Sequence, residues 1–135
     1  SALAGDIVRG GGALPRPACI LAGGETTVTL RGAGLGGRNQ EMALAVLREI
    51  AERPAAYTGV TFLSVGTDGT DGPTDAAGAY AAPELLRRDP AGAPGAIADA
   101  LQRNDAYHLF QRVGGLYTTG PTNTNVCDIQ VLLVE

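Results

Sequence analysis

The sequence predicts one α/β domain in which a mixed sheet is flanked by helices. The chain has 135 residues, 44% of them hydrophobic, which is enough for a single hydrophobic core. The apolar run Val60 to Val65 is typical of a buried strand. Residues 38–53 place apolar side chains at helical spacing, and Pro54 ends that segment. A buried strand and an amphipathic helix in one short chain indicate the α/β class.

Further segments along the chain each indicate one helix or strand. Three are apolar or alternating and predict strands, at residues 18–23, 25–31 and 128–134. Four carry weaker helical patterns, at residues 1–10, 83–88, 95–103 and 105–113. Asn104 is the expected N-cap of the last of these helices. The sequence shows no internal repeat and no linker, so residues 1–135 are predicted to form one unit.

Charge and hydropathy exclude two classes of partner. The net charge of −4 argues against nucleic acid, and no stretch is long and apolar enough to span a membrane. Asp6 and Arg9 interrupt the N-terminus before a signal peptide can form, so we expect a cytoplasmic protein. Cys19 and Cys127 are then expected to be reduced packing residues, with a disulfide or a reactive thiol as the alternative.

Residues 66–78 carry three carboxylates in a glycine-rich segment directly after a predicted strand. Open α/β sheets usually hold ligands where a strand ends in such a loop. Thr74 or Asp75 is expected to cap a following helix, whose free N–H groups suit an anion. Asp68 and Asp71 are candidate Mg²⁺ ligands, because Mg²⁺ favours one or two carboxylates together with substrate oxygens. The alternative is that these aspartates only cap turns.

Residues 32–37 match the glycine pattern of dinucleotide-binding loops, between a predicted strand and a predicted helix. In such folds an acidic residue about 20 positions later ends the second strand. Here that offset falls on Glu52, inside the predicted helix, which weakens the match. Backbone N–H groups of Gly34, Gly36 and Gly37 can still bind an anion at the helix N-terminus.

Arg38 stands at the start of the predicted helix, where the helix dipole disfavours a cation. A residue placed against its local preference is a functional candidate, so Arg38 is expected to meet a phosphate or a carboxylate. The alternative is that it pairs with an acid such as Glu41 or Asp68. Glu25 follows a double glycine and is either a ligand-facing acid or an ordinary edge carboxylate.

Residues 121–125 form a polar turn with four neutral hydrogen-bonding side chains in a row. Such a turn either caps itself or orients a ligand. The side chains that can contact a ligand are Thr122, Asn123, Thr124 and Asn125.

Four motifs together resemble the MOFRL domain, the C-terminal half of the glycerate 2-kinase family, whose members are often labelled hydroxypyruvate reductase. The motifs are GGETTV at 23–28, GxGxGGRNQE at 32–41, GTDGTDGPTDAAGA at 66–79 and GPTNTNVCD at 120–128. They occur in the family's order, and the resemblance extends over residues 18–134.

The resemblance implies an enzyme that phosphorylates D-glycerate at its 2-hydroxyl with Mg²⁺ and ATP. Family members have two α/β domains with the active site between them, and the N-terminal domain, which carries a lysine of the family, lies outside this chain. The chain itself contains no lysine. The expected partners are therefore glycerate, ATP and the N-terminal domain, with self-association into a homo-oligomer also considered, and the isolated chain is expected to be inactive.

The resemblance also suggests roles for the candidate residues. Arg38 is expected to stabilise the transferred phosphoryl group or to clamp the glycerate carboxylate. Asp68 or Asp71 is expected to bind Mg²⁺, and Asp68 is the candidate general base. Substrate or nucleotide contacts are expected from Glu25, Gly34, Gly36, Gly37, Asn39, Thr67, Thr122, Asn123 and Asn125. Arg38→Ala is predicted to abolish most turnover with little loss of folding.

Two other functions stay open at this point. One is an NAD(P)-dependent hydroxypyruvate reductase, which depends on the family label and the glycine pattern at 32–37. The other is a stand-alone domain that binds a small acid or a divalent metal through residues 66–75.

Overall fold

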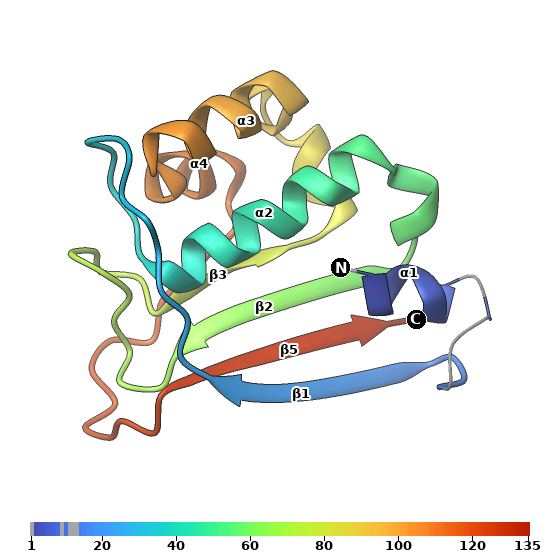
Figure 1. The fold of residues 1–135 in the computed structure, drawn as a ribbon, viewed down its shortest axis with the longest axis horizontal. Helices are drawn as coiled ribbons and strands as arrows, with labels where there is room; N and C mark the ends of the chain where they lie inside the picture. Colours follow the sequence, from blue (N-terminus) through green and yellow to red (C-terminus); the bar gives the residue numbers. More distant parts are fainter. Residues whose placement is uncertain (1, 9, 11–13) are drawn as a thin grey trace.

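The computed structural model describes residues 2–8, 10 and 14–135, and it contains one five-stranded sheet (Figure 1). The strand order is β1-β5-β2-β3-β4. The strands are β1 (Ala18–Gly24), β2 (Val60–Gly66), β3 (Gly78–Ala81), β4 (Leu116–Tyr117) and β5 (Asp128–Val134). The predicted α/β class is confirmed, but all four strand pairings are antiparallel, where a mixed sheet was predicted.

The helices pack on one face of the sheet, with α2 in the centre (Figure 1). They are α1 (Ala2–Val8), α2 (Arg38–Glu52), α3 (Pro94–Arg103) and α4 (Ala106–Val113), joined by 3₁₀ turns at Pro54–Tyr57, Pro83–Arg87 and Pro90–Gly92. The apolar stripe of α2 is buried against the sheet through Ala43, Leu44, Leu47 and Ile50. Among the described helices, none is long and apolar enough to cross a membrane.

The opposite face of the sheet, which we call the outer face, carries no described helix (Figure 1). Side chains alternate between the two faces along each strand. The inner positions of β5, such as Val134, are buried in the core, whereas Ile129 and Leu133 are exposed. Leu21 of the edge strand β1 is 70% exposed. The outer face is therefore apolar and open to solvent.

Residues 25–31 form a loop, so the strand predicted there is wrong. The loop is held by Asn104, whose side-chain oxygen accepts the N–H groups of Arg31 at 2.7 Å and Gly32 at 3.0 Å. Its amide nitrogen lies 2.7 Å from a carboxylate oxygen of Glu41. Asn104 adopts a left-handed conformation with φ 53° and caps the C-terminus of α3, not the N-terminus of α4 as predicted.

Residues 67–77 connect β2 to β3, so the helix predicted after Thr74 and Asp75 is also wrong. β3 contains two alanines, one tyrosine and Gly78, a composition without the β-branched signal of a strand. Gly78 lies against β2 so closely that an added Cβ would be 2.0 Å from the carbonyl oxygen of Ser64. This close approach fixes β3 at its place in the sheet.

We expect Gly78→Ala to destabilise the fold by about 1–3 kcal/mol or more, because the clash is with backbone that cannot rotate away. Gly95 in the first turn of α3 is the matched control, since a Cβ there meets nothing within 4 Å. Gly95→Ala should be neutral or stabilise by about 0.5–1 kcal/mol. Urea unfolding of both variants tests the pair, and equal midpoints would contradict the close packing of β3.

Candidate functional site

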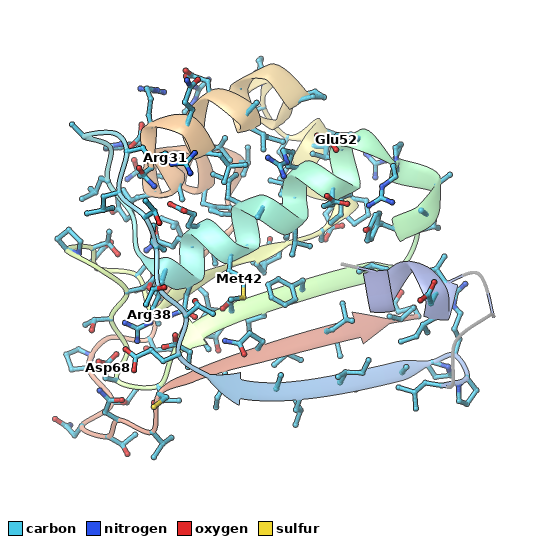
Figure 2. All side chains as sticks on the ribbon, in the orientation of Figure 1. Arg31, Arg38, Met42, Glu52 and Asp68 are labelled. Atoms are coloured by element: carbon cyan, nitrogen blue, oxygen red, sulfur yellow. The ribbon has the colours of Figure 1, made fainter. Side chains whose placement is uncertain are left out.

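The candidate site lies at one end of the sheet, around a row of three paired residues on neighbouring strands: Gly24, Asp128 and Gly66. Asp128, the first residue of β5, is paired with Gly24 at the end of β1 and with Gly66 at the end of β2. The chain leaves Gly24 directly into Glu25 and leaves Gly66 into the loop that carries Asp68. Figure 2 shows Arg38 and Asp68 at this same end of the sheet. The register of β5 therefore brings three loops and the start of α2 together.

Arg38, Asp128 and Glu25 form an ion cluster, which we call the Arg38 cluster. The Arg38 Nε lies 2.6 Å from Oδ2 of Asp128, and Nη2 lies 2.8 Å from Oδ1. Nη1 lies 3.2 Å from Oε1 of Glu25. The side chain of Asp128 is fully buried, whereas those of Arg38 and Glu25 are 35% and 57% exposed. Arg38 thus has one buried bidentate partner and one exposed partner.

Electrostatics fixes the charge of both members of the bidentate pair. Burial by itself raises the pKa of Asp128, but hydrogen bonds from Arg38 and Asn39 and the Arg38 charge outweigh it, so the pKa lies below its usual range. The hydrogen bond to Asp128 raises the pKa of Arg38, against the opposing effect of burial. At neutral pH the pair is therefore ionised.

Asp128 uses only part of the hydrogen-bonding capacity of Arg38. A guanidinium has five N–H donors, and the bidentate contact uses that of Nε and one of Nη2. The other three, on Nη1 and Nη2, remain for Glu25 and for a ligand. Arg38 pairs with neither Glu41 nor Asp68, the partners considered from the sequence. Asp128 was missed there, although an aspartate that opens a strand as apolar as DIQVLLV signals a buried cation partner.

Asp71 caps α2 and does not face a ligand. Its carboxylate is buried and accepts the backbone N–H groups of Asn39 at 3.0 Å and Gln40 at 2.8 Å. A Cβ on Gly37 would lie 2.3 Å from the Asp71 carboxyl carbon, so this glycine makes room for the cap. Both carboxylate oxygens of Asp71 therefore bind the first turn of α2, the capping role that was the alternative to a metal ligand.

Asn39 is also internal, in contrast to its predicted ligand contact. It is buried, accepts the Ser64 hydroxyl at 2.6 Å and donates to Asp71 at 3.1 Å. Ser64 belongs to β2, so this side chain joins the start of α2 to the sheet. Asn39 also donates a hydrogen bond to Asp128, so it helps to hold the carboxylate that pairs with Arg38.

The glycine stretch 32–37 does not have the geometry of a dinucleotide-binding loop. The loop at residues 25–31, not a strand, leads into it, and the Gly34 N–H donates to the carbonyl oxygen of Arg103 at 2.9 Å. The N–H of Leu35 donates to Asp105 at 3.0 Å. Figure 2 shows Glu52 at the opposite end of α2 from Arg38, too far along the helix to serve the same site. The stretch is anchored to the α3–α4 corner instead.

Asp68 lies in a second group of residues, on the loop after β2. Its Oδ1 accepts the Thr70 N–H at 3.0 Å, and its Oδ2 has a contact of 3.4 Å with the Asn125 amide. Its carbonyl oxygen accepts the N–H of Thr122 at 3.1 Å, and the Thr67 hydroxyl donates to the Cys127 carbonyl oxygen at 2.7 Å. These contacts tie the loop after β2 to the loop before β5.

The tip of the loop before β5 is exposed to solvent. Asn123 lies there in a left-handed conformation with φ 59°. Among the described residues, no group of three or more His, Cys, Asp or Glu side chains is arranged to hold a metal ion.

A cavity of about 450 Å³ opens beside the Arg38 cluster. Its walls include Glu25, Arg38 and the glycines at 34, 36 and 37, with Val28 and Leu30 on its apolar side. This volume falls within the range of small-molecule pockets. Asp68, Thr67, Thr122, Asn123 and Asn125 do not line it; they form the neighbouring group described above.

Residues 18–128 match the MOFRL family. The chain belongs to this family. The MOFRL domain described here is 50% identical over 125 residues to a glycerate kinase of Bos taurus, covering 90% of this chain and 24% of that protein. It is 41% identical over 127 residues to a D-glycerate 2-kinase of Thermotoga maritima, covering 90% of this chain and 28% of that protein.

Solved structures agree with the sequence relatives. A crystal structure of a glycerate kinase from Thermotoga maritima superposes with a TM-score of 0.86 at 38% identity, over 99% of this chain and 31% of that one. The MOFRL domain thus spans about a quarter to a third of the relatives that it matches. It corresponds to one part of those larger proteins.

Both cysteines of the MOFRL domain are exposed and free, so the packing role predicted for them is wrong. Cys19 is on the outer face of β1, paired with Leu133. Cys127 precedes Asp128 with φ 67°, a left-handed conformation unusual for a residue with a side chain. Its carbonyl oxygen, not its thiol, makes the contacts to the loop after β2.

The structure changes the expectation for folding of an Arg38→Ala variant. Removing one partner of a buried ion pair costs about 3–5 kcal/mol, and the 35% exposure of Arg38 places the expected loss at or below the lower end of that range. Arg48→Ala on the same helix is the control, because its exposed pair with Glu52 contributes at most about 1 kcal/mol.

The loss in Arg38→Ala should depend on pH with a defined sign. In the unmodified protein the lowered pKa of Asp128 stabilises the fold above the unfolded carboxyl pKa of about 3.9, and this is lost as the pH falls through the folded value. Without Arg38, burial raises the pKa of Asp128. Acidification then protonates this carboxyl group and removes the free-energy cost of an unpaired buried charge. Thermal melts should show that the difference in melting temperature between the unmodified protein and Arg38→Ala becomes smaller from neutral pH toward about pH 4. A difference in melting temperature that does not change with pH would contradict the presence of an unpaired, buried Asp128 carboxylate in the variant.

Proposed function

We propose that the chain is the MOFRL domain of a D-glycerate 2-kinase, which transfers a phosphoryl group from ATP to the 2-hydroxyl of glycerate. The observation that carries this proposal is Arg38, held by a buried carboxylate with free N–H donors beside a cavity. Both the carboxylate of glycerate and the transferred phosphoryl group are anions that such a guanidinium binds. A relative named glycerate kinase, 50% identical in sequence, and one named D-glycerate 2-kinase, 41% identical, support the same reaction.

Glu25 is the contact of Arg38 that a substrate can replace. An exposed ion pair contributes about 1 kcal/mol or less, whereas Asp128 is buried and bidentate. An incoming anion therefore displaces Glu25 and leaves Asp128 in place. The released Glu25 carboxylate then lies at the cavity wall, where it can accept a hydrogen bond from a substrate hydroxyl.

Asp68 is the residue proposed to hold Mg²⁺ or to accept the proton of the attacking hydroxyl. Its Oδ1 is fixed by Thr70, and the single long contact of Oδ2 leaves an oxygen for a cation or a proton. One carboxylate is sufficient, since Mg²⁺ takes its other ligands from substrate phosphates and water. Mg²⁺ bound there would neutralise charge on the ATP phosphates. Thr122 and Asn125 contact Asp68, and Thr67 precedes it in the chain. These three residues, with Asn123 at the tip of the loop before β5, are proposed to orient ATP or glycerate.

The site is proposed to be completed by a second, N-terminal domain. The chain has no lysine and contributes one arginine to the Arg38 cluster, while ATP carries several negative charges. The loops at residues 25–31 and 120–127 are largely exposed, as expected for surfaces that meet another domain. The isolated chain is therefore expected to bind weakly and to be inactive.

The reductase alternative has lost its support from the sequence pattern. A loop, not a strand, leads directly into the glycine stretch 32–37, and its N–H groups at Gly34 and Leu35 are bonded within the protein. A dinucleotide phosphate needs such groups free.

Phosphorus NMR tests the proposed reaction on the full-length polypeptide that carries this domain, with D-glycerate, ATP and Mg²⁺. The expected product is 2-phosphoglycerate from the full-length protein and none from the 135-residue chain. Failure of the folded full-length protein to form it would reject the kinase. Oxidation of NADH with hydroxypyruvate as substrate would establish the reductase in its place.

Asp68→Asn and Asp71→Asn form a matched pair that separates chemistry from capping. Asp68→Asn should lower turnover by about 100-fold or more, because it removes a charge and a base, while the unfolding midpoint stays near that of the unmodified protein. Asp71→Asn should cost about 1–3 kcal/mol of stability, since its amide must face the N–H of Asn39 or Gln40. Turnover and urea unfolding of both variants decide the matter, and the reverse pattern would exchange the two roles.

A further inference from the structure

The strongest unassigned feature is Asp128, which Arg38 requires for its position and which the reaction proposed above does not use directly. We propose that Asp128 is a positioning residue for glycerate phosphorylation: its buried carboxylate fixes the guanidinium plane of Arg38, so that the remaining N–H donors point to the anionic group of the substrate. This inference rests on the proposed kinase function.

The contact geometry distinguishes Asp128 from Glu25. Two roughly parallel hydrogen bonds, of 2.6 Å and 2.8 Å, fix both the position and the plane of the guanidinium. The single contact of Glu25, at 3.2 Å, fixes neither. The bidentate contact also engages the side of the guanidinium that contains Nε. The donors on the terminal nitrogens are left together, and these form the fork that matches a carboxylate or a phosphate.

The neighbours of Asp128 in the sheet make room for this contact. Both of its cross-strand partners, Gly24 and Gly66, lack a side chain, so neither neighbouring strand places a side chain directly beside Asp128. A Cβ on Gly66 would lie 2.6 Å from the carbonyl oxygen of Thr70 and 3.7 Å from Oδ1 of Asp128. The same row therefore determines where Arg38 stands relative to the loop of Asp68.

Stability alone is a weak reason for this pair. Burying the Asp128 carboxylate costs several kcal/mol of desolvation, and apolar side chains in place of a buried ion pair often stabilise a fold equally well. Asp128 is buried directly behind Arg38, and Arg38 lines the cavity at the end of the sheet. A role of Asp128 in the reaction, exerted through Arg38, explains why a carboxylate is buried here despite its desolvation cost.

A double-mutant cycle in the full-length polypeptide tests the proposal. Asp128→Asn should lower kcat by about 10- to 100-fold, the usual effect of removing a partner that orients a functional group, with a smaller change in KM. In the Arg38→Ala background the same substitution should change kcat by less than about threefold, because the residue it positions is gone. Asp128→Glu, which keeps the charge, should retain more activity than Asp128→Asn. A purely structural role would give equal losses in both backgrounds and would overturn the proposal.

Chemical rescue provides a second readout, made on variants that circular dichroism shows to be folded without guanidinium. Millimolar guanidinium should restore part of the activity of Arg38→Ala, since the ion can occupy the place beside Asp128, and should restore none to the Arg38→Ala/Asp128→Asn double variant. The double variant lacks both charges of the pair, so it is expected to fold even if Asp128→Asn alone does not. Equal rescue of both variants, or no rescue of either, would overturn the positioning role.

The outcomes for the proposal and for the kinase function are distinct. An unmodified full-length protein that forms no 2-phosphoglycerate rejects the kinase function. An active unmodified protein whose Asp128→Asn variant keeps its kcat rejects only the role of Asp128.

Discussion

The bidentate ion pair between Asp128 and Arg38 is the contact on which the candidate site depends. It joins the first residue of the interior strand β5 to the first residue of α2, and it is buried on the carboxylate side. The loops that carry Glu25 and Asp68 leave the sheet from the same row, beside Gly24 and Gly66. This one interaction therefore links the register of the sheet to the position of α2 and to the geometry of the site.

The start of α2 resolves an electrostatic conflict with a second carboxylate. A cation in the first turn is unfavourable near the positive end of the helix dipole. Asp71 caps that turn through two backbone N–H groups and also contributes to the raised pKa of Arg38. Two aspartates with different tasks thus surround one arginine: Asp71 completes the helix, and Asp128 holds the side chain.

The sequence predicted the elements with strong local patterns and missed contacts between distant segments. The strands near Ala18, Val60 and Asp128 and the helix from Arg38 are confirmed because each carries its own apolar period. The alternation at 25–31 was misleading, since no neighbouring strand pairs with it and Asn104 holds it as a loop. The pairing of Arg38 with Asp128 spans 90 residues, and Asp71 reaches α2 from 32 residues away. Neither partnership has a signal in local spacing, so the arginine was found while its partner was not.

Arg38 is partly exposed and Asp128 is buried, and this difference constrains the order in which the two residues can be replaced during evolution. If Asp128 is replaced first, Arg38 still reaches water and Glu25, because a third of its side chain is exposed. If Arg38 is replaced first, a carboxylate is left in the interior without a counter-charge, and the fold itself suffers. A lineage that abandons the chemistry of this site therefore loses the aspartate before the arginine. Inactive descendants should retain an arginine at the start of α2 beside a neutral residue at the start of β5.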